Sequence, residues 1–296
     1  TPDELKDLLT LRTAEVEGVE RMGKNLQHVV TGRLVDFEKI EGSDKLHKAT
    51  VDVGKNKIQL VFGSVHEVKK GWILPIALPG AIMANGMEIK KGMFAGVDSH
   101  GMIADDKELG IENTPGGLTV FPEGTPLGTP IADVLGMRDT IFTIDNKSLT
   151  HRPDLWGHYG MAREFAAFLG KKLKPYAPKV TFPRKGAQVK VVVQDKDIIR
   201  RGSFVIVEGI TVAESPQWIK TRLQATGVRP INNIVDITNY VMLELGQPMH
   251  AYDRKLVKGD KLTLRRAHEG EAIRAIDHKT YTLTKEDSVI DNSGKP

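Results

Sequence analysis

The residues best suited to chemistry lie between positions 229 and 253, in the run RPINNIVDITNYVMLELGQPMHAYD. Its apolar spacing predicts a helix, on which Asn232, Asp236 and Asn239 recur at i, i+4 and i+7 and therefore share one face. A glycine and a proline end this helix, and His250 follows in the next turn. Amides beside one imidazole on a rigid turn can position a water molecule and a polar substrate. The competing interpretation is structural, because a buried polar helix face usually satisfies neighbouring backbone groups.

Arg229 precedes Pro230 at the head of the same helix. Arginine side chains and the N-termini of helices both favour phosphate groups. A solvated arginine in a turn explains these residues equally well, so the residues leave both interpretations open.

Several common kinds of site find no support in the chain. It has no cysteine among 296 residues, which excludes disulfides, thiolate metal ligands and thiol catalysis. Its nine histidines show no metal-site spacing, so no metal ligand is predicted. Neither a G-x-x-x-x-G-K-[ST] loop nor a helix-opening G-x-G-x-x-G motif occurs, so the residues do not indicate a nucleotide-triphosphate site.

The composition also bears on compartment. No apolar run reaches the roughly 18 residues of a membrane-spanning helix, so we expect no membrane partner. A chain without cysteine fits a reducing compartment, and we expect a cytoplasmic protein.

Residues 28–130 are expected to form a small barrel. Apolar and polar residues alternate on either side of a turn at 54–57, which is typical of a hairpin, and glycines then recur about every ten residues. Small open barrels bind single-stranded nucleic acid across one face. This range, however, carries 11 Lys and Arg against 13 Asp and Glu, which disfavours strong non-specific RNA binding, and a purely structural barrel is the alternative.

Helices are predicted on both sides of this barrel. The first starts at Thr1 and Pro2, and the second spans residues 149–172, with Asp154 as its N-cap and Gly170 at its end. A proline-rich linker follows at 174–184.

The last third, residues 181–296, is expected to mix strands and helices. It carries 19 Lys and Arg against 14 Asp and Glu, which allows an anionic partner. The chain stops just after an apolar segment, so we expect this domain to be incomplete. Strands are predicted at 189–194, 202–212, 260–267 and 275–283, the last around a turn at Asp277-His278, and a helix at 215–227.

Three motifs occur in an order that resembles one family. They are GVDSHGMIADDKELGI, HRPDLWGHYGMAREFAAFLG and the run from Arg229 to Asp253. Over essentially its whole length the chain resembles an N-terminal fragment of the bacterial phenylalanine–tRNA ligase beta subunit. Stand-alone tRNA-binding proteins carry a similar barrel but lack the two later motifs.

The resemblance implies an α+β multidomain fold. An OB-type β-barrel at 23–138 would be inserted in a small discontinuous α+β domain formed by 1–22 and 139–180. A truncated α/β editing domain would follow at 181–296.

The resemblance also implies an activity. Such a subunit supports ATP-dependent attachment of phenylalanine to tRNA(Phe), at a site in the alpha subunit, and hydrolyses mischarged Tyr-tRNA(Phe). The editing residues of the family fall here on Thr238, Asn239 and His250, and the residue that would hold the tRNA end falls on Arg229. The remaining pocket residues would lie downstream, which implies that the fragment alone is inactive.

Partners and cofactors follow from the same resemblance. It implies an alpha subunit in an α2β2 heterotetramer, tRNA(Phe), and ATP with Mg²⁺ bound at holoenzyme sites outside this fragment. The alternative is a non-catalytic OB-fold module that only binds tRNA.

Overall fold

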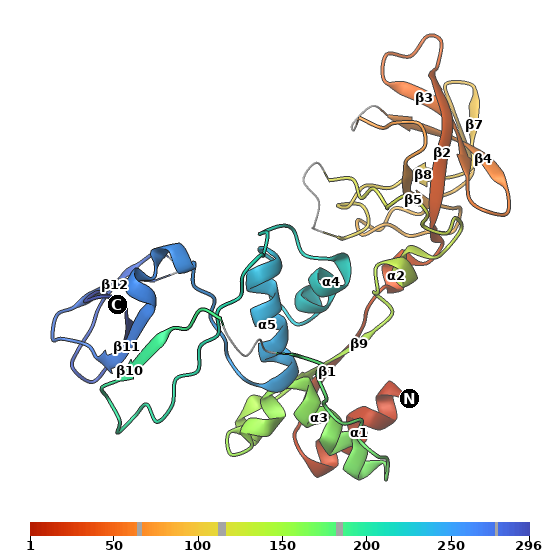
Figure 1. Ribbon diagram of the computed structural model, residues 1–296. Coiled ribbons are helices and arrows are strands. Elements are labelled where there is room, and N and C mark those ends of the chain that lie inside the picture. Colours follow the sequence, from red (N-terminus) through yellow and green to blue (C-terminus); the bar gives the residue numbers. More distant parts are fainter. Residues whose placement is uncertain (64–66, 112–116, 182–185, 276–277) are drawn as a thin grey trace. The chain divides into compact units, whose positions relative to one another are not determined.

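The computed structural model describes the whole chain except residues 64–66, 112–116, 182–185 and 276–277 (Figure 1). The chain divides into two compact units, which are described separately below. The first contains Thr1–Trp156 and Pro216–Pro230, and the second contains Gly157–Ser215 and Ile231–Pro296. The domain boundaries predicted from the sequence stay a prediction.

The first unit opens with helix α1 (Pro2–Arg12), which has the predicted start at Thr1 and Pro2. The Thr1 hydroxyl accepts a hydrogen bond from the Glu4 backbone at 3.3 Å, and the Glu4 carboxylate contacts the Thr1 amino group at 2.6 Å. This reciprocal capping satisfies two donors that would otherwise lack partners at the helix start.

Two strands of the first unit lie before and after the five-stranded sheet in the sequence. Strand β1 (Val16–Arg21) pairs antiparallel with β9 (Thr140–Ile144), although the two are separated by more than a hundred residues of chain. The pairing continues beyond the strands, because the Met22 backbone N–H donates to the Asp139 carbonyl at 2.9 Å.

Between β1 and β9, a curled five-stranded antiparallel sheet has the order β4-β3-β2-β5-β8. The predicted hairpin is confirmed: β3 and β4 pair from Leu46↔Gly63 to Asp52↔Lys57. Two clusters of buried apolar side chains pack against the sheet. The strands are β2 (Val29–Lys39), β3 (Leu46–Asp52), β4 (Lys57–Gly63), β5 (Ile73–Ala77) and β8 (Met102–Ile103), and a hairpin is formed by β6 (Gly92–Phe94) and β7 (Val97–Ser99).

Gly32 in β2 shows why a glycine is needed inside this sheet. A Cβ built at that position would lie 2.5 Å from Ile76 Cγ1 and 2.7 Å from Val51 Cγ1. Both neighbours are buried, so the core has no room for even a methyl group there. The remaining elements of the first unit are η1 (Lys24–Leu26), α2 (Ile131–Val134), η2 (Asn146–Leu149), η3 (Pro153–Trp156) and α4 (Gln217–Ala225).

The predicted helix at 149–172 is interrupted, and the prediction that Asp154 is its N-cap is wrong. Helix α3 (His158–Phe168) begins after Gly157, which has extended backbone angles. The Asp154 carboxylate instead accepts two hydrogen bonds from Arg152, both at 2.9 Å, so it is engaged by a side chain rather than by the helix start. The predicted helix end at Gly170 is confirmed by its positive φ of 60°.

The second unit holds a small mixed sheet of order β10-β11-β14. Strand β10 runs parallel to β11, and β14 runs antiparallel to it. Two further strands, β12 and β13, pair as a hairpin; of its predicted turn, Asp277 lies outside the described residues, whereas His278 adopts a φ of 65°. The bounds are β10 (Lys190–Val193), β11 (Lys261–Arg266), β12 (Ala272–Arg274), β13 (Thr280–Thr282), β14 (Ser288–Asp291), α5 (Asn233–Leu245), η4 (Arg254–Leu256) and η5 (Lys258–Asp260).

The strand predicted at 202–212 does not form. Alternating apolar residues suggested a half-buried strand, yet Val205 and Val207 are 65% and 63% exposed. No strand of the described chain pairs with this segment, and a strand without a partner cannot satisfy its backbone or bury one face.

Candidate functional site

Helix α5 carries the polar residues singled out in the sequence. At its start, Asn232 and Asp236 form hydrogen bonds that stabilise the fold. The Asn232 side chain is the N-cap, accepting from the backbone N–H groups of Ile234 at 3.0 Å and Val235 at 3.1 Å. Asp236 is fully buried, and its carboxylate accepts from the Ile231 backbone at 2.8 Å and from the Ser215 hydroxyl. The structural interpretation therefore holds for Asn232 and Asp236.

Thr238 and Asn239 lie farther along α5, and both are half-buried. The Thr238 hydroxyl donates to the Val235 carbonyl at 2.7 Å, so its hydrogen is engaged while its oxygen can still accept a hydrogen bond. Within the described part of the chain, the Asn239 amide has no hydrogen-bond partner. Asn239 therefore has both a donor and an acceptor available on a rigid helix.

The helix ends at Gly246, whose positive φ of 73° turns the chain away from the helix axis. Its N–H still bonds to the Met242 carbonyl at 2.8 Å. His250 follows on an exposed, irregular segment. No hydrogen bond joins His250 to Thr238 or Asn239 among the residues that the structure describes, so their cooperation stays a prediction.

The His250 imidazole packs against Tyr252, a residue to which the sequence assigned no role. The two ring centroids are 4.6 Å apart with an interplanar angle of 61°, the edge-to-face arrangement favoured by aromatic rings. Burial raises the pKa of the Tyr252 hydroxyl, so this group stays protonated. The only signal for Tyr252 was its place two positions after His250 in the motif.

Arg229 belongs to the first unit, whereas Thr238, Asn239 and His250 belong to the second. It is exposed and follows helix α4. That helix is anchored within its own unit, because Thr221 donates to the Leu135 carbonyl at 2.8 Å and Leu223 is fully buried. Arg229 therefore extends from a well-packed element with its guanidinium accessible to an anion.

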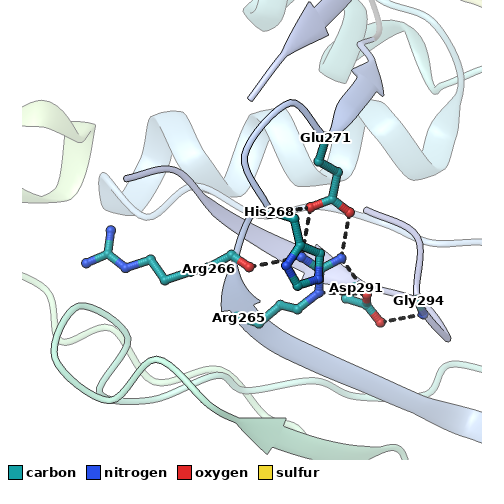
Figure 2. A network of polar contacts seen from close by, with 6 residues as sticks. All are labelled: Arg265, Arg266, His268, Glu271, Asp291 and Gly294. Carbon is teal, nitrogen blue, oxygen red and sulfur yellow. Dashed lines mark hydrogen bonds and ion pairs between the residues drawn. The ribbon is translucent and has the colours of Figure 1, made fainter. Parts of the chain in front are cut away.

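The most connected group of charges in the second unit surrounds Arg265 (Figure 2). Its guanidinium binds the two Glu271 oxygens at 2.7 and 2.8 Å, Asp291 at 2.8 Å and the Arg266 carbonyl at 2.9 Å. The Arg265 bonds and the His268 backbone N–H lower the pKa of Glu271 to about 2. In turn, the carboxylates raise the pKa of Arg265.

Every N–H of the Arg265 guanidinium is engaged in this network, which joins β11 to β14 and to the turn before β12. The Gly294 backbone also donates to Asp291 at 2.9 Å. Since no charged group in it is left to bind a ligand, we interpret the network as structural.

No group of three or more histidine, aspartate and glutamate side chains within the described ranges is arranged to hold a metal ion. None of the helices described is both long and apolar enough to cross a bilayer.

Two parts of the chain match models of known protein families. Residues 29–130 match the model described as "Putative tRNA binding domain", and residues 199–296 match the model described as "B3/4 domain". The first range covers the five-stranded sheet, and the second covers helix α5 and the segment bearing His250.

Whole-chain comparison finds relatives named phenylalanine–tRNA ligase beta subunit. The protein of Clostridium acetobutylicum is 39% identical over 300 residues, which cover 99% of this chain and 37% of the relative. That of Geobacter metallireducens is 37% identical, covering 100% and 37%, and that of Solibacter usitatus is 41% identical, covering 98% and 36%. The chain thus spans little more than a third of the length of these relatives.

A solved structure is also similar to part of the chain. The MetRS related protein from Pyrococcus horikoshii is 25% identical, covering 34% of this chain and 85% of that protein. Its TM-score of 0.26 is too low to assign a fold from it.

Proposed function

Since the chain belongs to the phenylalanine–tRNA ligase beta subunit family, we propose that it binds tRNA(Phe) and contributes one side of a pocket that hydrolyses Tyr-tRNA(Phe). The observation that carries the proposal is the presence of a tRNA-binding match and a B3/4 match in one chain that aligns with these relatives over nearly all its residues. The curled sheet is then an OB-type barrel, and residues 181–296 are an incomplete editing domain.

The bond to be broken is the ester between an amino acid and the terminal ribose. Its hydrolysis needs a positioned water molecule and stabilisation of the developing oxyanion. We assign His250 to orient and polarise the water, since its imidazole is exposed and its ring nitrogens can donate and accept hydrogen bonds. Its edge-to-face contact with Tyr252 restricts the ring orientation that this task needs.

The helix supplies the complementary contacts. The Asn239 amide can hold the aminoacyl ester by hydrogen bonds, because it has no partner within the described residues. The Thr238 hydroxyl donates to the Val235 carbonyl, which fixes its side chain on the helix, and Thr238 forms a wall of the pocket. Arg229 neutralises a phosphate near the tRNA end.

Selection of tyrosine over phenylalanine is also explained by hydrogen bonding. A pocket built to pair with a hydroxyl discriminates strongly, because the analogue without it leaves buried polar groups unpaired. We place the groups that recognise this hydroxyl outside residues 1–296, and therefore expect these residues alone to hydrolyse Tyr-tRNA(Phe) poorly.

The complete enzyme is proposed to attach phenylalanine to tRNA(Phe) in an α2β2 assembly, using ATP and Mg²⁺ at sites outside residues 1–296. Among the residues that the structure describes, no cluster of side chains is suited to a metal ion. Their part is to bind, orient and hydrolyse.

The test is His250→Ala in the complete beta subunit assembled with its alpha subunit. We expect deacylation of Tyr-tRNA(Phe) to fall by about 10²- to 10⁴-fold, the usual contribution of a proton-transferring side chain, with attachment of phenylalanine nearly unchanged. His151→Ala, another exposed histidine, is the matched control. Unchanged deacylation in His250→Ala would remove this residue from the mechanism.

The competing function is a tRNA-binding module without hydrolytic activity. Within the described chain, no hydrogen bond joins His250 to the α5 residues. This observation is what a tRNA-binding module without hydrolytic activity would show. A complete beta subunit that binds tRNA(Phe) but never deacylates Tyr-tRNA(Phe), with or without the alpha subunit, would establish the module.

A further inference from the structure

We propose that Gly157 and His158 are positioning residues for the hydrolytic site, because they hold the end of α5 from which the His250 segment departs. The inference rests on the proposed function, in which His250 must face groups on α5. It assigns a task to the Gly-His pair of the HRPDLWGHYG motif, which the proposed function does not use.

The first observation is the lack of room at Gly157. A Cβ at this position would lie 2.4 Å from the Gly246 nitrogen, 2.6 Å from the Leu245 carbonyl carbon and 2.9 Å from the Glu244 carbonyl oxygen. All three are backbone atoms of the end of α5, which cannot move aside as a flexible side chain does. The backbone angles of Gly157, φ −138° and ψ 150°, suit any residue, so glycine is required for space and not for conformation.

The second observation is a hydrogen bond beside this contact. His158 Nδ1 lies 2.8 Å from the Leu243 carbonyl oxygen. A carbonyl only accepts, so Nδ1 carries the hydrogen and donates it. The last carbonyl groups of a helix lack partners within the helix, and His158 therefore caps the C-terminal end of α5 with its side chain.

These contacts fix the exit point of the segment 247–252. Gly246 is in the left-handed region with φ 73°, and the chain leaves the helix at this residue on its way to His250. Asn239 lies seven residues earlier, about 10 Å along the helix axis at 1.5 Å per residue. A shift or rotation at Gly246 therefore changes the distance from His250 to Asn239 directly.

Small errors in such a distance matter for hydrolysis. A misplacement of about 1 Å between reacting groups costs on the order of 10²-fold in rate, even when the substituted residue is remote from the chemistry. Gly157 and His158 need not touch the substrate to control the rate.

The experiment compares four variants of the complete beta subunit assembled with the alpha subunit. Gly157→Ala forces a methyl group against the α5 backbone, and His158→Ala removes the capping donor. His158→Asn is the conservative variant, since its amide N–H can donate in place of Nδ1. Gly63→Ala is the matched control, because a Cβ there meets nothing within 4 Å.

We expect Gly157→Ala to lower kcat for Tyr-tRNA(Phe) deacylation by about 10- to 100-fold, with KM and phenylalanine attachment near wild type. We expect His158→Ala to lower kcat for deacylation less than Gly157→Ala does. We expect His158→Asn to have a kcat near wild type. Equal kcat for Gly157→Ala, His158→Ala and Gly63→Ala would overturn the inference. If Gly157→Ala does not fold, the comparison of kcat between His158→Ala and His158→Asn still tests the positioning role.

A second readout separates this inference from the proposed function. Hydrogen exchange of the amides of residues 246–252 is expected to rise about tenfold in Gly157→Ala and His158→Ala, and to stay unchanged in His158→Asn and Gly63→Ala. If His250→Ala leaves deacylation intact, the proposed hydrolytic role fails, whatever the exchange shows. If exchange is equal in all variants, the positioning role fails by itself.

Discussion

Replacing Asp236 by alanine tests how the start of α5 is held. The carboxylate is fully buried at 0% exposure, and it accepts from the Ile231 backbone at 2.8 Å and from the Ser215 hydroxyl. Alanine leaves both donors without an acceptor, and each buried unsatisfied group costs about 1–3 kcal/mol. Because Ile231 is itself largely exposed, its N–H partly regains water, so we expect Asp236→Ala to lower the free energy of unfolding of the second unit by about 2–4 kcal/mol.

The assay is native-state hydrogen exchange in rising urea on the complete beta subunit with its alpha subunit, following peptides from α5 (Asn233–Leu245). Asp236→Asn keeps one carbonyl acceptor and sets an amide beside the Ser215 hydroxyl, so its loss is expected to be about 1 kcal/mol. Glu244→Ala on the same helix is the control. A loss below about 1 kcal/mol for Asp236→Ala, or equal losses for alanine and asparagine, would refute the assigned hydrogen bonds.

Two further predictions concern the sheets. The Arg265 contact lowers the pKa of Glu271 from 4.5 to about 2, so its contribution to stability is complete above pH 4.5 and is lost as the pH falls toward 2. The urea midpoint is therefore expected to fall more steeply in this range for wild type than for Glu271→Gln, and parallel pH profiles would contradict this. In the five-stranded sheet, we expect Gly32→Ala to destabilise by about 1–3 kcal/mol in urea unfolding, because its Cβ would overlap Ile76, whereas Gly63→Ala is expected to be near neutral. Equal midpoints for the two alanine variants would show that the core can accommodate the extra methyl group.

The parts of the fold that were predicted correctly depend on neighbours in sequence. The cap at Thr1 acts three residues away, and the β3–β4 hairpin needs only a turn and two alternating segments. The segment 202–212 has the same alternation of apolar and polar residues. A strand also needs a neighbouring strand to pair with, and the alternation does not show which one that would be. Asp154 is a good N-cap by residue type, but Arg152 two residues before it competes for its carboxylate with two hydrogen bonds.

The candidate site shows the same limit. Periodicity correctly placed Thr238 and Asn239 on one helix, because the spacing of apolar residues is a local property. It could not show that Asp236 is engaged by Ser215, since that contact depends on a turn 21 residues earlier. The demand for glycine at position 157 arises from backbone almost ninety residues later, and no local pattern carries that information.

The pairing of β1 with β9 has a consequence for the chain between them. Arg21 and Thr140 are partners in the ladder, so the chain leaves and rejoins this two-stranded ribbon at adjacent points. To the ribbon, everything between them is equivalent to an unusually long turn, and a two-residue connection joining Arg21 to Thr140 would restore an ordinary hairpin. Removing the residues between these two points would therefore leave the register of the two paired strands unchanged.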